Sequence, residues 1–92
     1  TFEVIYHPQV KEKDLLGIPR NVRERIRKAI EARLVSDPVL AGKPLRQSLR
    51  GHRKMRVGDY RVIYRVDEDA SKIFVLIIGN RKEVYSKVFK RF

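Results

Sequence analysis

The sequence lacks cysteine altogether, and histidine occurs only twice among its 92 residues. Without cysteine, the chain cannot be a disulfide scaffold, a zinc ribbon or a thiol enzyme. The two histidines, His7 and His52, are too few for a transition-metal site formed by this chain alone. We therefore expect neither a metal nor a cofactor.

Long apolar runs are absent as well. No stretch approaches the roughly 20 apolar residues of a membrane-spanning helix, and the N-terminus does not show the basic-then-apolar pattern of a secretory signal. Acidic residues are scarce, since 11 of them stand against 22 basic residues and leave a net charge of +11. Such a charge favours polyanionic partners, nucleic acid first and an anionic membrane surface second. We expect a single cytoplasmic domain, residues 1–92, that works without a membrane.

Hydrophobic periodicity predicts an α+β fold with the element order β-α-α-β-β-β-α. Residues 36–38 (Ser-Asp-Pro) should end the second helix, and residues 41–51 should form a connector. Because three strands follow one another late in the chain, the sheet should be small and mostly antiparallel. The predicted strands cover residues 1–7, 53–57, 60–67 and 73–78, and the predicted helices cover residues 9–16, 22–34 and 83–89.

The two-residue turn Gly58-Asp59 predicts the register of a β-hairpin, with Arg56 opposite Arg61. Directly paired residues share a face of the sheet, and faces alternate along each strand. A slip by one residue would bury several charges, so the pattern determines the register. The predicted core face carries Met55, Val57, Tyr60, Val62, Tyr64 and Val66. The predicted cationic face carries His52, Lys54, Arg56, Arg61, Ile63 and Arg65.

Positive charge is concentrated in residues 50–65 and 81–92, which contain half of the basic residues but only two acidic ones. Like charges directly opposite each other, such as Arg56 and Arg61, destabilise a sheet, so stability alone does not account for this pattern. It indicates a surface that binds a polyanion. An exposed strand face kept soluble by its charges is the alternative. The predicted phosphate contacts are Arg53, Arg56 and Arg65.

Two runs, KMRVGDYRVIYR (residues 54–65) and IGNRKEVY (residues 78–85), resemble the RelE/ParE superfamily of toxins from type II toxin–antitoxin systems. The run VRERI (residues 22–26) and the later Asp37-Pro38 also fit that superfamily. The resemblance covers nearly the whole chain. It implies the RelE-like fold, in which two N-terminal helices pack on one face of the sheet and a C-terminal helix follows.

Resemblance to the RelE branch implies an endonuclease that cuts mRNA on the ribosome, by attack of a 2′-OH on the adjacent phosphate. Carried over by position, Lys54 would help to remove the 2′-OH proton, Arg61 would stabilise the phosphorane, and Arg81 would neutralise the leaving oxygen. Tyr85 would stack on a base, although its spacing from Arg81 is shorter than in some relatives. His52 stands where some relatives have a second lysine, and it is either a proton-transfer group or a hydrogen-bonding residue at the rim.

The resemblance also implies the partners, which are a RelB-like antitoxin, the ribosome and mRNA. The toxin alone is expected to be a monomer that forms a hetero-oligomer with the antitoxin. Two alternatives stay open on the sequence alone. One is a ParE-like inhibitor of DNA gyrase, which would share the fold. The other is a nucleic-acid-binding module without enzymatic activity, which would account equally for the charge.

Overall fold

The computed structural model describes residues 1–91 and shows a five-stranded sheet with the strand order β1-β5-β4-β3-β2. The edge strand β1 runs parallel to β5, and every other pair is antiparallel. The strands are β1 (Glu3–Tyr6), β2 (Lys43–Pro44), β3 (Arg53–Val57), β4 (Tyr60–Asp67) and β5 (Lys72–Asn80). The helices are α1 (Arg20–Ala29), α2 (Pro38–Ala41) and α3 (Val84–Val88).

Short helical turns complete the architecture. Two turns, Val10–Asp14 and Leu15–Gly17, form the first N-terminal helix, and α1 continues through a π-helical turn at Ile30–Leu34. Together they confirm the predicted α+β fold with two N-terminal helices, a mostly antiparallel sheet and a C-terminal helix. In the part of the chain that the structure describes, no helix is both long and apolar enough to cross a bilayer.

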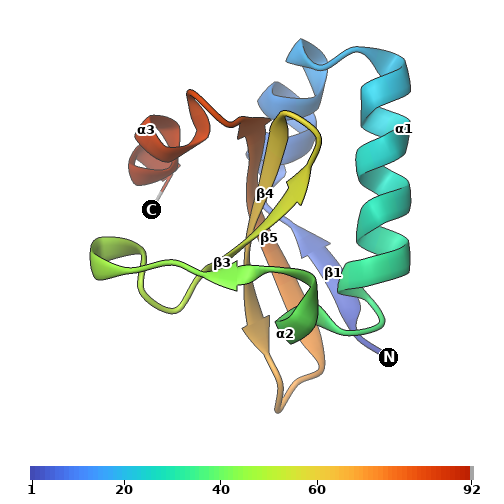
Figure 1. The fold of residues 1–92 in the computed structure, drawn as a ribbon, viewed down its shortest axis with the longest axis vertical. Helices are drawn as coiled ribbons and strands as arrows, with labels where there is room; N and C mark the ends of the chain where they lie inside the picture. The colour runs from blue at the N-terminus through green and yellow to red at the C-terminus, as the bar shows by residue number, and fades with distance from the viewer. Residues whose placement is uncertain (92) are drawn as a thin grey trace.

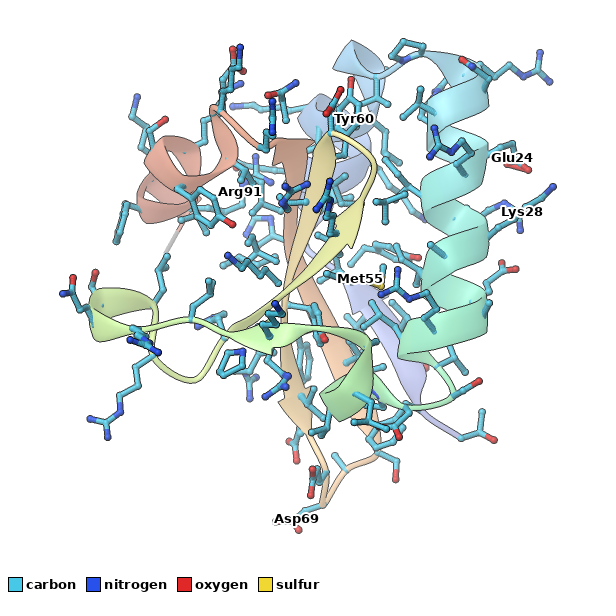
Figure 2. All side chains as sticks on the ribbon, viewed as in Figure 1. Glu24, Lys28, Met55, Tyr60, Asp69 and Arg91 are labelled. Carbon is cyan, nitrogen blue, oxygen red and sulfur yellow. The ribbon has the colours of Figure 1, made fainter. Side chains whose placement is uncertain are left out.

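The main core lies between the sheet and the N-terminal helices. Figure 1 shows the strands between α1 on one side and α3 on the other. Ile26, Ile30 and Leu34 recur at helical spacing and are buried against the sheet. Met55 lies between β3 and α1 (Figure 2) and is fully buried. This is the core face that the hairpin register predicts.

A second apolar cluster covers part of the other face of the sheet. Ile63 is 0% exposed there, where it packs with Leu49, Ile77, Val84 and Val88. The sequence placed Ile63 on the cationic face; the register confirms that face, but the prediction that Ile63 belongs to a cationic surface is wrong, because the residue is buried. The sequence pattern of β4 does not reveal the covering, because the residues that cover Ile63 come from α3 and from the turn before β3. The cationic surface is therefore divided by a buried patch.

The predicted hairpin register is confirmed. Arg56 pairs with Arg61 and Val57 pairs with Tyr60, and Gly58 adopts the positive φ of 58° that the tight turn requires. Between β4 and β5 the register shifts at Ile63 and Tyr64. Both residues are fully buried, one on each face, because β4 is covered on both sides.

The expected connector at residues 41–51 contains structure that the sequence did not predict. Strand β2 pairs with β3 at the edge of the sheet, and a 3-10 turn spans Gln47–Leu49. The segment that ends the long helix also begins α2. Pro38 occupies its first turn, where the missing N–H costs nothing, and the Asp37 carboxylate accepts a hydrogen bond from the Leu40 N–H at 3.1 Å.

A buried ion pair fastens the C-terminal segment to the rest of the fold. Arg91 follows α3 and donates two hydrogen bonds to the Asp14 carboxylate, at 2.6 and 2.9 Å. The side chains of Arg91 and Asp14 are 8% and 7% exposed. Asp14 also accepts from the Ile78 N–H at 2.9 Å, and Arg91 donates to the Leu76 carbonyl at 3.2 Å. Figure 2 labels Arg91 beside α3.

Replacing Arg91 by alanine is expected to lower the free energy of unfolding by about 3 kcal/mol, because it leaves the Asp14 carboxylate buried without its countercharge. Urea unfolding checks this value. The control is Arg27→Ala, which removes an exposed arginine paired with Glu24 and Glu31 on α1 and should cost much less. Equal losses in the two variants would contradict the role given to the buried pair.

Candidate functional site

Strands β3 and β4 bring three predicted site residues to one cleft. Lys54, Arg56 and Arg61 line a cavity of about 370 Å³. Arg33 and Lys43 line it as well, and none of the described residues that line it is acidic. We call this cavity, lined by Arg33, Lys43, Lys54, Arg56 and Arg61, the basic cleft. Five cations around one cavity favour a ligand with several negative charges.

Sequence reasoning missed Arg33 and Lys43. Arg33 lies on the π-helical turn after α1 and donates to the Arg56 carbonyl at 3.2 Å and to the Ala41 carbonyl at 3.1 Å. Lys43 lies on β2 directly opposite Lys54. No local signal in the sequence marks either residue, because each one reaches the cleft through a tertiary contact.

Helix α3 places Tyr85 beside Lys54, one of the residues that line the basic cleft. Val84 and Val88 are fully buried on one side of this short helix, which fixes its position on the sheet. The Lys54 ammonium lies 5.7 Å from the centre of the Tyr85 ring, within the range of a cation–π contact. The aromatic ring that the sequence proposed for base stacking therefore lies beside the lysine proposed for proton transfer.

Arg61 and Arg81 each contact the turn between β3 and β4. The Arg61 guanidinium donates to the Gly58 and Tyr60 carbonyls at 3.0 and 2.9 Å. The backbone N–H of Arg81 donates to the Asp59 carbonyl at 2.9 Å. The side-chain Nε of Arg81 lies 4.0 Å from the Asp59 carboxylate. The Arg81 side chain is 53% exposed. A guanidinium has five N–H donors, so both arginines keep donors for a ligand.

His52 and Arg65 lie further along the same face. The His52 N–H donates to the Leu49 carbonyl at 3.1 Å, and its own carbonyl accepts from Leu45 at 2.9 Å. Partial burial lowers the pKa of the His52 imidazole, and the positive charge of Arg65 lowers it further. The Arg65 guanidinium lies 4.6 Å from the centre of the Phe74 ring. Both effects favour the neutral form of the His52 imidazole.

Arg53 stands apart from the other predicted phosphate contacts. It pairs with Tyr64, so it lies on the face of the hairpin opposite Lys54. Its guanidinium donates to the Val39 and Gly42 carbonyls at 2.6 and 2.9 Å. The structure thus places Arg53 against α2 rather than in the basic cleft. In residues 1–91, no three His, Asp or Glu side chains group as metal ligands would.

Comparison with known proteins gives a family. Residues 4–85 match the family described as "ParE toxin of type II toxin-antitoxin system, parDE". Toxin RelG of Mycobacterium tuberculosis is 29% identical over 75 residues, which are 82% of this chain and 86% of RelG. Toxin RelE of the same organism is 32% identical over 73 residues, which are 79% of this chain and 75% of RelE.

Solved structures show the same fold. A chain of the toxin–antitoxin complex RelBE2 from Mycobacterium tuberculosis matches with a TM-score of 0.81 and 28% identity, over 87% of this chain and 98% of that chain. A chain of the RelE–RelB complex from Pyrococcus horikoshii matches with a TM-score of 0.73 and 28% identity, over 88% and 96%. A mutant of the E. coli toxin RelE in the free state has a TM-score of 0.74 at 22% identity, over 99% and 97%.

Replacing Gly42 by alanine is expected to destabilise the fold by about 2 kcal/mol through overpacking. A Cβ atom at Gly42 would collide with the Lys54 carbonyl and the Tyr64 hydroxyl, so β3 would have to move at the cleft. Gly17→Ala is the matched control, because a Cβ there meets nothing within 4 Å. Thermal unfolding of both variants checks the difference, and an equal melting temperature for the two would contradict it.

Protonation of His52 is expected to destabilise the folded protein at mildly acidic pH. The folded-state pKa lies below the ordinary value of 6.5, so the unfolded chain binds the proton more readily. The contribution to stability is complete above about pH 6.5 and is lost as the pH falls through the folded-state pKa. Urea unfolding at pH 7.5 and pH 5.0 should show a smaller pH dependence in His52→Gln than in the wild type. The same dependence in both proteins would contradict this.

Proposed function

This chain belongs to the RelE/ParE superfamily of toxins from type II toxin–antitoxin systems, and from that premise we propose that it is a ribosome-dependent mRNA endonuclease. The observation that supports the proposal is the basic cleft with Tyr85 beside Lys54. An aromatic ring next to a group of cations suits single-stranded RNA, whose bases stack and whose phosphates need neutralising. The relatives named RelG and RelE support the RelE branch.

The proposed reaction is an internal transfer of the phosphodiester. The 2′ oxygen attacks the adjacent phosphorus, the bond from phosphorus to the 5′ oxygen breaks, and the products are a 2′,3′-cyclic phosphate and a 5′-OH. The transition state gathers negative charge on the phosphoryl oxygens and on the leaving oxygen. Arg61 stabilises the phosphoryl oxygens, and Arg81 neutralises or protonates the leaving oxygen. Arg56 and Arg65 bind neighbouring phosphates.

The 2′-OH proton needs an acceptor near the attacking oxygen. Lys54 lies in the cleft next to Tyr85 and is the first choice for this role. His52 is the second choice, because its lowered pKa keeps the imidazole in the neutral form that accepts a proton. Tyr85 holds the base so that the 2′-OH is in line with the phosphate. Each step uses a protein side chain and requires no metal.

The proposal includes a cognate antitoxin. The similar structures from Mycobacterium tuberculosis and Pyrococcus horikoshii are toxin–antitoxin complexes. We propose that an acidic segment of a RelB-like antitoxin covers the basic cleft of this chain, since the net charge of +11 favours such a partner. The free toxin is then a monomer that acts in the cytoplasm, where the ribosome and mRNA are found.

A gyrase inhibitor is the second candidate function, because the matched family is described as the ParE toxin. It would use the same fold without cutting RNA. A nucleic-acid-binding module without catalysis is the third candidate. In that case Arg61→Ala would weaken binding, and there would be no cleavage to lose.

In a cell-free translation reaction, Arg61→Ala and Arg81→Ala are each expected to slow mRNA cleavage by about 100-fold or more, because each variant removes a cation from the charged transition state. Primer extension on the message measures the cuts. The wild type should cut translated message in phase with the codons. Lys28→Ala is the control, because it also removes one positive charge. Lys28 lies on the outer side of α1 (Figure 2), so this variant should cut the message like the wild type.

Other outcomes separate the candidates. Intact message in the presence of the wild type would overturn the endonuclease, and a DNA supercoiling assay would then test gyrase inhibition. Cleavage of free RNA would overturn only the proposed dependence on the ribosome and would leave the endonuclease activity in place. Cleavage that survives both substitutions would overturn the roles given to Arg61 and Arg81.

A further inference from the structure

The short helix α2 is held by side chains from three other elements. A helix leaves its last carbonyls without partners inside the helix. Here the Tyr64 hydroxyl donates to the Pro38 carbonyl at 2.6 Å. Arg53 donates to the Val39 and Gly42 carbonyls, and Arg33 donates to the Ala41 carbonyl. Four residues that would not form a stable helix alone are thus fixed in place.

This fixed helix presents apolar side chains to solvent at the basic cleft. Leu40 is 83% exposed and Val39 is 43% exposed. Only two further large apolar side chains among residues 1–91 are exposed, Leu16 and Phe89. A single exposed leucine is ordinary on a protein surface. Leu40 differs because it lines the basic cleft on a helix that buried and cationic side chains hold rigid.

We propose that α2 is part of the RNA-binding site, with Leu40 packing on a nucleobase while Arg33 and Lys43 bind the adjoining phosphates. The inference rests on the proposed function and extends it from Tyr85 and Lys54 to residues of α2, β2 and the turn after α1. Proteins that bind single strands combine a positively charged groove with side chains, mostly aromatic, on which bases stack, and apolar side chains also pack on the faces of unstacked bases. The RNA strand would then run from Tyr85, past Lys54 and Arg61, to Leu40.

The size of the apolar patch favours a base over a protein helix. A partner helix that docks on a protein needs a hydrophobic groove long enough to receive apolar side chains from several turns of that helix. On α2 the exposed apolar surface is limited to Val39 and Leu40, and cations line the cleft next to it. One nucleobase matches the small apolar surface of Val39 and Leu40, and its phosphate matches the positive charge of the cleft.

The test is the affinity for a short RNA that cannot be cut. The probe is a fluorescein-labelled hexanucleotide with 2′-O-methyl groups throughout, and fluorescence anisotropy at low salt measures Kd. Leu40→Ala should raise Kd by about three- to tenfold, because it removes apolar contact with the base. Leu16→Ala is the matched control, since Leu16 is 75% exposed and lies outside the cleft, and it should leave Kd unchanged. Both variants should unfold at the wild-type temperature.

Two further measurements test the parts of the inference separately. A hexanucleotide with an abasic site at the contacted position should bind wild type and Leu40→Ala equally. Lys43→Ala should weaken binding to every sequence and reduce the salt dependence by about one unit of slope. An unchanged Kd in Leu40→Ala overturns the inference. A loss of RNA affinity that persists on a fully abasic strand also overturns it, as does a loss of affinity for the antitoxin with no loss of affinity for RNA.

The outcomes also separate this inference from the endonuclease. Cleavage of translated message with no effect of Leu40 on RNA affinity overturns the role of α2 alone. An effect of Leu40 on RNA affinity without cleavage supports the role of α2 and overturns the endonuclease.

Discussion

The buried contact between Asp14 and Arg91 is the interaction on which the geometry of the site depends. Helix α3 has five residues, too few to be stable without tertiary contacts. Val84 and Val88 bury one side of α3, and Arg91 ties the segment after it to Asp14 and to the carbonyl of Leu76 on β5. Because α3 carries Tyr85, these contacts place the aromatic ring beside Lys54. A residue near the start of the chain thereby fixes one near its end.

The basic cleft is an arrangement that the rest of the fold must stabilise. Arg56 and Arg61 are cross-strand partners of like charge, which weakens a hairpin. The burial of β4 compensates for this repulsion, since Ile63 and Tyr64, which lie next to each other on this strand, are fully buried on opposite faces of the sheet. Backbone carbonyls also surround the arginines, because Arg61 donates to the turn and Arg33 donates to the Arg56 carbonyl. Packing and hydrogen bonding together allow the cations to stay close.

Local patterns predicted the hairpin and its register, because Gly58-Asp59 and the alternation of apolar and basic residues leave one consistent pairing. They also placed Lys54, Arg56 and Arg61 on one face. They did not predict the burial of Ile63, the strand β2 or the roles of Arg33 and Lys43, all of which depend on contacts between distant segments. Arg53 shows the limit most clearly. Its position in a basic run suggested a phosphate contact, whereas its partner across the hairpin, Tyr64, places it against α2.

The parallel pairing of β1 with β5 has a consequence for the order in which the molecule is completed. Glu3 pairs with Lys72, so the ribosome makes β1 well before the strand that it pairs with. Until β5 exists, β1 has no neighbour in the sheet, and α1 has only part of the surface on which it packs. Contacts between residues so far apart in sequence slow folding, since a long loop must close before they form. A partly made chain therefore has the cations of the basic cleft, which lie within residues 33–61, before the sheet is complete and before Tyr85 is made.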